Sequence, residues 1–131
     1  MDIELLIRTV IDAAYQVHLA LKPGFLESVY QKALMKELDK RGIKARDKQP
    51  INVFYGEVNV GRFEADIIVE NILILELKAV SHLSEEHSIQ LVNYLTATGL
   101  DTGLLINFGS QRIEIRRKFR TYDPTKRKKT R

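Results

Sequence analysis

The sequence contains no cysteine. This absence excludes disulfide bonds, zinc sites with cysteine ligands, iron–sulfur clusters and thiol catalysis. No stretch of the chain approaches the ~20 apolar residues that a membrane-spanning helix needs. The first twelve residues, MDIELLIRTVID, carry three acids where a secretory signal has a basic start and an apolar centre. We therefore expect a cytoplasmic protein that does not enter the membrane.

The length and composition indicate one globular domain. A chain of 131 residues can bury one core, and its 44% hydrophobic and 29% charged residues lie close to the average for globular proteins. Disordered and fibrous classes are excluded by the same balance. We predict a single domain over residues 1–120, followed by a basic tail over residues 121–131.

Positive charge is concentrated at the end of the chain. Residues 1–110 hold 11 Lys and Arg against 15 Asp and Glu, whereas residues 111–131 hold 10 against 2. A basic segment attracts polyphosphates by releasing counterions, so nucleic acid is the expected partner and an anionic membrane surface the lesser alternative. The final KRKKTR is equally typical of a solubilising tail.

Apolar residues at a spacing of three and four predict three helices. Lys22–Gly24 and Gly42 would end the first two, and Ser84 and Gly99 are the expected N-cap and stop of the third. The predicted helices are Ile3–Leu21, a second with an apolar stripe from Leu26 to Leu38, and Glu85–Thr98.

Between and after these helices the pattern changes to the period of two that is typical of strands. The predicted strands are Gln49–Phe54, Val58–Val69, Leu73–Lys78, Thr102–Asn107 and Gln111–Lys118. The third is apolar on both faces as far as Glu76, which indicates a central strand. The expected order is ααβββαββ, an α/β fold with a mixed sheet flanked by helices.

Charged residues interrupt the apolar pattern of the second and third strands. Glu76 and Lys78 are two residues apart and so share one face, and Asp66 lies among apolar neighbours. A three-residue loop at 70–72, with Asn71 left-handed, would place Asp66 opposite Glu76, whereas a two-residue loop would turn them apart. The alternative to a functional site is a structural ion pair with Lys78.

Two helices add polar side chains that could meet the charged residues of the strands. Glu27 lies at the edge of the buried stripe of the second helix. His87, Gln90 and Tyr94 form one polar line along the third helix. Such a cluster suits metal-assisted phosphoryl transfer, because carboxylate oxygens bind hard cations such as magnesium or manganese and a lysine stabilises negative charge in the transition state.

Three motifs in this sequence occur together in known proteins. Gly24-Phe25-Leu26-Glu27-Ser28-Val29-Tyr30 matches the signature GxxExxY, Asp66 followed by Glu76-Leu77-Lys78 matches the D…ExK core, and Gln90 with Tyr94 matches the QxxxY motif of RecB-like nucleases. The chain therefore resembles the GxxExxY protein family within the PD-(D/E)XK nuclease superfamily, over about residues 11–108. The resemblance implies a restriction-endonuclease-like core.

The same resemblance implies roles for the motif residues. Asp66, Glu76 and the main-chain carbonyl of Leu77 would ligate the metal, and Lys78 would contact the scissile phosphate or the attacking water. Glu27 would complete the metal shell or hold a metal-bound water.

The resemblance also assigns the polar line on the third helix. Gln90 and Tyr94 would orient Lys78 or grip a phosphate. Two positions depart from the family pattern: Lys22 where relatives often have glycine, and Ala65 at the proline of the superfamily name.

The histidines are weaker candidates. His18 could support the metal site from a distance, and His87 could touch a phosphate, whereas packing or solvent exposure would explain both equally well. His82 shows no pattern that points to a role.

We therefore expect a magnesium-dependent nuclease acting on nucleic acid, DNA foremost, with phosphate contacts from the basic end of the chain. The first alternative is a nucleic-acid-binding module or complex subunit that keeps the fold with little turnover. The second is a protein-interaction domain whose acids bind calcium or pair with Lys78. Since one small domain offers little surface for sequence recognition, specificity would come from a homodimer, a partner protein or substrate shape.

Overall fold

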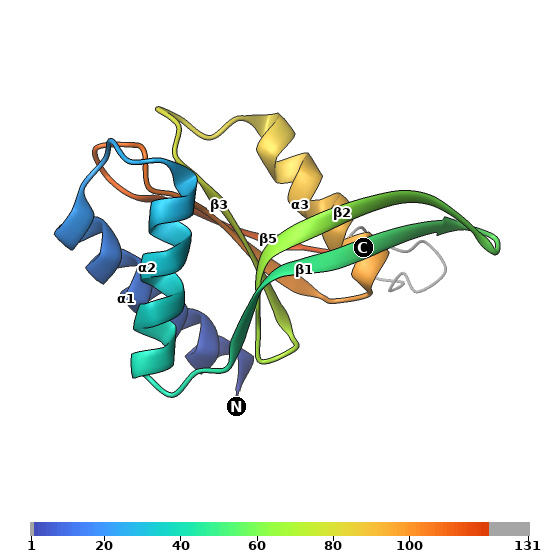
Figure 1. Ribbon diagram of the computed structural model, residues 1–131, viewed down its shortest axis with the longest axis horizontal. Helices are drawn as coiled ribbons and strands as arrows, with labels where there is room; N and C mark the ends of the chain where they lie inside the picture. The colour runs from blue at the N-terminus through green and yellow to red at the C-terminus, as the bar shows by residue number, and fades with distance from the viewer. Residues whose placement is uncertain (1, 121–131) are drawn as a thin grey trace, which may run out of the picture.

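The computed structural model describes residues 2–120, and the predicted basic tail at 121–131 lies outside them. Its elements follow the predicted order ααβββαββ, which is confirmed (Figure 1). They are α1 (Ile3–Leu21), α2 (Glu27–Lys40), β1 (Ala45–Tyr55), β2 (Val58–Val69), β3 (Leu73–Lys78), α3 (Glu85–Thr98), β4 (Thr102–Asn107) and β5 (Glu114–Phe119). Within this part of the chain, no helix is both long and apolar enough to cross a membrane.

The starts of two strands differ from the prediction by three or four residues, and their ends by one. β1 begins at Ala45 instead of Gln49, because Ala45 already pairs with Val69. β5 begins at Glu114 instead of Gln111, because the preceding residues form a bend closed by a hydrogen bond from Ser110 to the Arg112 carbonyl. Both differences lie at ends that short-range patterns locate poorly.

The five strands form one sheet in the order β1-β2-β3-β4-β5. All neighbouring pairs are antiparallel except β3 and β4, which are parallel and are connected through α3. A parallel pair requires such a crossover, and here it places α3 on one face of the sheet. The predicted mixed α/β architecture is confirmed.

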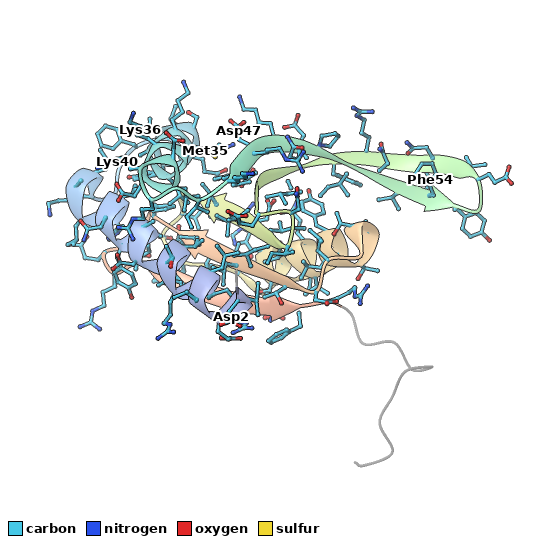
Figure 2. The ribbon with its side chains drawn as sticks, turned by 90° about the horizontal axis from the view of Figure 1, so that it is seen from below. Asp2, Met35, Lys36, Lys40, Asp47 and Phe54 are labelled. Carbon is cyan, nitrogen blue, oxygen red and sulfur yellow. The ribbon has the colours of Figure 1, made fainter. Side chains whose placement is uncertain are left out.

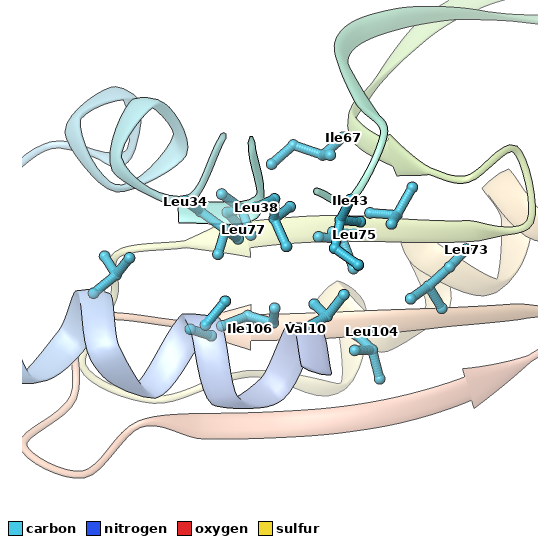
Figure 3. Close-up of a cluster of buried hydrophobic side chains, with 14 of the residues drawn as sticks. Val10, Leu34, Leu38, Ile43, Ile67, Leu73, Leu75, Leu77, Leu104 and Ile106 are labelled. Carbon is cyan, nitrogen blue, oxygen red and sulfur yellow. The ribbon is translucent and has the colours of Figure 1, made fainter. Parts of the chain in front are cut away.

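The central strand β3 separates two apolar cores. Leu73, Leu75 and Leu77 are buried on the face covered by α1 and α2 (Figure 3). Ile74 is buried on the opposite face, in a smaller cluster with Leu91, Tyr94 and Leu95 of α3. Alternation along one strand therefore serves two layers of helices, as the apolar character of both its faces predicts.

The hairpin of β1 and β2 extends well beyond the rest of the sheet as an arm (Figure 2). A register shift between Val53 and Phe54 marks an irregularity that breaks strict pairing along the arm. Five large apolar side chains on the hairpin are exposed: Phe54, Tyr55, Val58, Val60 and Phe63. The arm therefore presents apolar surface that the core of the protein does not cover.

Candidate active site

The turn between β2 and β3 sets the register on which the site depends. Ile67 pairs with Leu75 and Val69 with Leu73, which leaves a three-residue loop. Glu70 and Asn71 take left-handed backbone angles in it, with φ of 51° and 62°. The structure therefore has the three-residue loop, one of the two alternatives that the sequence left open, and its register puts Asp66 across from Glu76.

The strand pairing between β2 and β3 stops before Asp66 and Glu76. From there on, the carboxylates of these two residues accept hydrogen bonds from the backbone of the opposite strand. The Asp66 backbone N–H donates to Glu76 Oε2 at 3.0 Å, and the Leu77 N–H donates to Asp66 Oδ2 at 2.7 Å. Each carboxylate thus accepts a hydrogen bond from the backbone of the neighbouring strand. This exchange fixes both carboxylates at the point where the strands separate.

The first strand is also irregular at this level. Lys48, between the paired residues Asp47 and Gln49 in β1, has a φ of 52° and interrupts the ladder beside Asp66. Asp66 is also bonded to a helix, because Gln31 of α2 donates from Nε2 to the Asp66 carbonyl at 3.1 Å. Asp66 is therefore held at a local break in the sheet, tied to a helix as well as to β3.

Burial makes ionisation of the acid pair costly. Glu76 is only 4% exposed. Burial, and then the adjacent charge of Asp66, raise the pKa of Glu76 to about 8. Burial also raises the pKa of Asp66, while the hydrogen bond from Leu77 and the charge of Lys78 oppose the rise. A cation placed at the two carboxylates would relieve this cost.

Glu27 lies at the first position of α2, close enough to the pair to interact with it electrostatically. Burial raises its pKa, the charge of Lys78 and a hydrogen bond from the Ala79 backbone oppose the rise, and the charge of Asp66 adds to it. Among residues 2–120, however, no group of three or more His, Asp or Glu side chains is placed to hold one metal ion. Asp66 and Glu76 exchange hydrogen bonds between their strands, and Glu27 interacts with Asp66 and Lys78 through its charge.

Tyr30, the tyrosine of the GxxExxY motif, has a structural role. Its side chain is fully buried and stacks on Phe108, with ring centroids 4.8 Å apart and planes inclined by 6°. Its hydroxyl donates to the Lys22 carbonyl at 2.5 Å and accepts from the Phe25 N–H at 3.1 Å. Tyr30 therefore closes the loop that leads into α2.

This closure matters because α2 begins without a side-chain cap at Leu26. The loop also contains Gly24 at a φ of 130° and Lys22 at a φ of 60°, both in the region that favours glycine. Sequence reasoning placed Tyr30 in the apolar stripe of its helix and missed the role of its hydroxyl. Its spacing of three residues from Glu27 was the available signal.

The helix α3 supplies the polar side chains expected from the QxxxY motif. Gln90 Oε1 accepts a hydrogen bond from Lys78 Nζ at 3.4 Å. Tyr94 is 8% exposed, and burial followed by the charges of Glu76 and Asp66 raises its pKa. The structure therefore brings Asp66, Glu76, Lys78, Gln90 and Tyr94 together.

The chain leaving Lys78 is fixed by residues that the sequence did not single out. Asn107 Oδ1 accepts from the Val80 N–H at 2.9 Å, and its Nδ2 donates to the Val80 carbonyl at 2.8 Å. A Cβ atom on Gly109 would lie 2.4 Å from the Val80 nitrogen, so only glycine permits this approach. The end of β3 is thereby held from the β4 side.

The three histidines are not grouped at the acids. His18 is buried, with Nε2 bonded to the Ser110 carbonyl at 3.0 Å. His87 forms a capping box with Ser84, in which His87 Nδ1 accepts from the Ser84 N–H. Burial lowers the pKa of His87, and the charge of Lys78 lowers it further. His82 is exposed. Packing therefore accounts for His18, whereas His87 caps α3, a role that the sequence pattern did not suggest.

The arginines near the end of β5 are largely committed to the protein itself. Arg116 donates to the Leu83 carbonyl and to Ser88 Oγ, and Arg117 makes two hydrogen bonds to the carboxylate of Glu4. Arg120 pairs with Asp101 at 2.7 Å. Charge counting therefore overstates what this strand offers to phosphates, since composition does not reveal intramolecular partners.

Comparison with known proteins places this geometry in a family. The family model described as the PD-(D/E)XK nuclease superfamily matches residues 4–118. No curated protein matches the sequence. A crystal structure of SSO0001 has a similar fold, with a TM-score of 0.60 at 20% sequence identity over 75% of this chain. This chain covers about half (52%) of that protein. With the family model matching nearly all of the described residues and the acids of the D…ExK pattern in contact, the chain belongs to the PD-(D/E)XK nuclease superfamily.

Proposed function

We propose that the protein hydrolyses phosphodiester bonds in nucleic acid, DNA foremost, with magnesium or manganese as its cofactor. The observation that carries this proposal is the contact of Asp66 and Glu76 with each other's strands at a break in the sheet, beside Lys78. Membership of the superfamily supports a nuclease-type fold. The hydrolytic activity, the metal and the nucleic-acid substrate are what we propose for this chain.

The residues present fit a hard divalent cation. Two carboxylates in contact, one of them nearly fully buried, form an oxygen-rich site that is unfavourable without positive charge. Asp66, Glu76 and the Leu77 carbonyl would hold the ion. When bound, it would lower the pKa of a water molecule and neutralise charge on the phosphate.

The remaining residues would act on the substrate directly. Lys78, held by Gln90 at 3.4 Å, would place its ammonium against the scissile phosphate, where negative charge grows in the transition state. Glu27, which interacts with Asp66 and Lys78 through its charge, would complete the metal shell or hold the attacking water. Tyr94, on α3 with Gln90, would orient Lys78 or grip a phosphate.

The test is cleavage of single-stranded and double-stranded DNA and RNA in magnesium, in manganese and in EDTA. Wild-type protein should cut with a metal and not in EDTA. Glu76→Ala and Lys78→Ala should each lose about 100-fold or more, the scale for removing one group that stabilises the transition state. Lys36→Ala, at an exposed lysine of α2 that belongs to none of the three motifs, should cut like wild type.

Two outcomes would count against this proposal. Equal cleavage by Lys78→Ala and wild type would mean that the activity comes from elsewhere. Salt-sensitive DNA binding without cutting in either metal would instead favour a binding module that keeps the nuclease fold, for which homodimer or partner contacts would then be sought.

A further inference from the structure

A groove lies between the hairpin arm and α3, next to the candidate active site. Its volume is about 640 Å³, within the range of ligand-binding sites. The arm contributes Val53 and Phe63 on one side, and α3 contributes Ile89, Gln90, Asn93 and Tyr94 on the other. Of these residues, Tyr94 belongs to the smaller apolar core, and the others belong to neither core.

The groove shares two residues with the candidate active site. Gln90, which accepts the hydrogen bond from Lys78 Nζ, lines the groove as well, and so does Tyr94. A strand with its phosphate at Lys78 would therefore carry its neighbouring nucleotide into the groove.

The chemistry of the lining selects the kind of group that fits. Phe63 is 46% exposed and its ring centroid lies 5.7 Å from that of Tyr94. Ile89 is 52% exposed, and Gln90 and Asn93 offer amide donors and acceptors. Among the described residues that line the groove there is no lysine or arginine, and Glu86 is present. An anionic phosphate is disfavoured there, whereas a flat, neutral ring with polar edges is favoured.

We infer that this groove receives an unpaired nucleobase of the substrate strand, stacked against Phe63, while the adjacent phosphate lies at Lys78. The inference rests on the proposed function. A base inside a duplex cannot enter such a groove without leaving its stack. The substrate is therefore single-stranded nucleic acid or the unpaired end of a duplex.

The experiment compares two phenylalanines on the same arm. Phe63 lines the groove, whereas Phe54 is 61% exposed near the outer end of the arm and does not line it (Figure 2). Binding of a fluorescently labelled single-stranded DNA oligonucleotide, and of the matching duplex, would be measured by anisotropy in EDTA. Phe63→Ala should weaken single-strand binding by about tenfold, since stacking of one base on one ring contributes roughly that much. Phe54→Ala should leave it unchanged, and neither variant should alter duplex binding.

Two further measurements separate stacking from folding. Phe63→Leu keeps an apolar side chain against Tyr94 but removes the aromatic ring, so it should fold like wild type and still weaken single-strand binding. An oligonucleotide with one abasic position should bind wild-type protein about as weakly as the intact oligonucleotide binds Phe63→Ala. The two losses should not add when combined, because they remove the same contact.

The outcomes distinguish this inference from the proposed function. Equal binding by Phe63→Ala, Phe63→Leu and wild type would overturn the nucleobase groove, even if Lys78-dependent cleavage is found. Phe63-dependent binding without cleavage would keep the groove and reject the nuclease. A change in oligomeric state in Phe63→Ala, with single-strand affinity unchanged, would assign the groove to a second copy of the chain and overturn the inference.

Discussion

The two faces of the sheet differ in how completely they are closed. The face under α1 and α2 is a continuous apolar core, with Leu34, Leu38, Leu75 and Leu104 fully buried (Figure 3). The face under α3 has a smaller core, and beside it lie the buried acids and the open groove. One face thus supplies the folding stability that lets the other retain costly charged groups. The following changes would break or sharpen that division.

The largest effect is expected from Glu76→Gln. Cleavage should fall by about 100- to 1,000-fold, because the amide carries no charge for a cation or a transition state. Folding stability at pH 8 should rise in the same variant, since a buried carboxylate next to Asp66 is removed while an oxygen remains to accept the Asp66 N–H. Urea unfolding in EDTA measures the second effect. A variant that loses both activity and stability would contradict the division between the faces.

The closed face should respond in the opposite way. Leu75→Ala removes a fully buried side chain between β3 and the helices α1 and α2. The expected loss is about 2–5 kcal/mol of unfolding free energy. Specific activity of the protein that remains folded should change little, and both quantities are measurable at low temperature. Phe54→Ala on the arm is the matched control, with a change within about 0.5 kcal/mol.

The acid pair should make stability depend on pH. The pKa of Glu76 is raised to about 8 in the folded protein, from an ordinary value of 4.5. Between these values the folded chain keeps a proton that the unfolded chain has released, so stability should fall as pH rises through this window. The fall should be on the order of 4 kcal/mol in EDTA between pH 5 and pH 9.

Two controls identify the group responsible for that slope. Glu76→Gln should flatten it, and magnesium should oppose it most strongly at high pH. A wild-type profile that rises from pH 5 to pH 9 in EDTA would show that the acids are not strained by burial.

The smallest effect is expected from Tyr30→Phe. Removing the hydroxyl leaves the Lys22 carbonyl and the Phe25 N–H without their partner, at a cost of about 1–2 kcal/mol of unfolding free energy. If Glu27 depends on this loop, kcat should fall several-fold while KM stays constant. Tyr15→Phe, at an exposed position on α1, should change neither quantity. A loss of stability with unchanged kcat would limit Tyr30 to folding.

The sequence predicted the order of elements, because that order depends on local rules, and it reduced the hairpin register to two alternatives. Apolar periodicity located the helices, and the choice of loop length alone decided whether Asp66 meets Glu76. The partners of Arg116 and Arg117, the role of Asn107 and the projecting arm could not be predicted in this way. Each depends on segments that are distant in sequence, such as Glu4 with Arg117. The hydroxyl of Tyr30 was likewise hidden, because a buried aromatic fits an apolar stripe whatever its polar end bonds to.

The exchange of hydrogen bonds between Asp66 and Glu76 has a practical consequence for anyone following this protein in solution. The amide protons of Asp66 and Leu77 point at carboxylates rather than at carbonyl groups. Their NMR chemical shifts would therefore register each protonation and each cation that arrives, without a label and without substrate. These two backbone resonances would report protonation and cation binding at the acid pair.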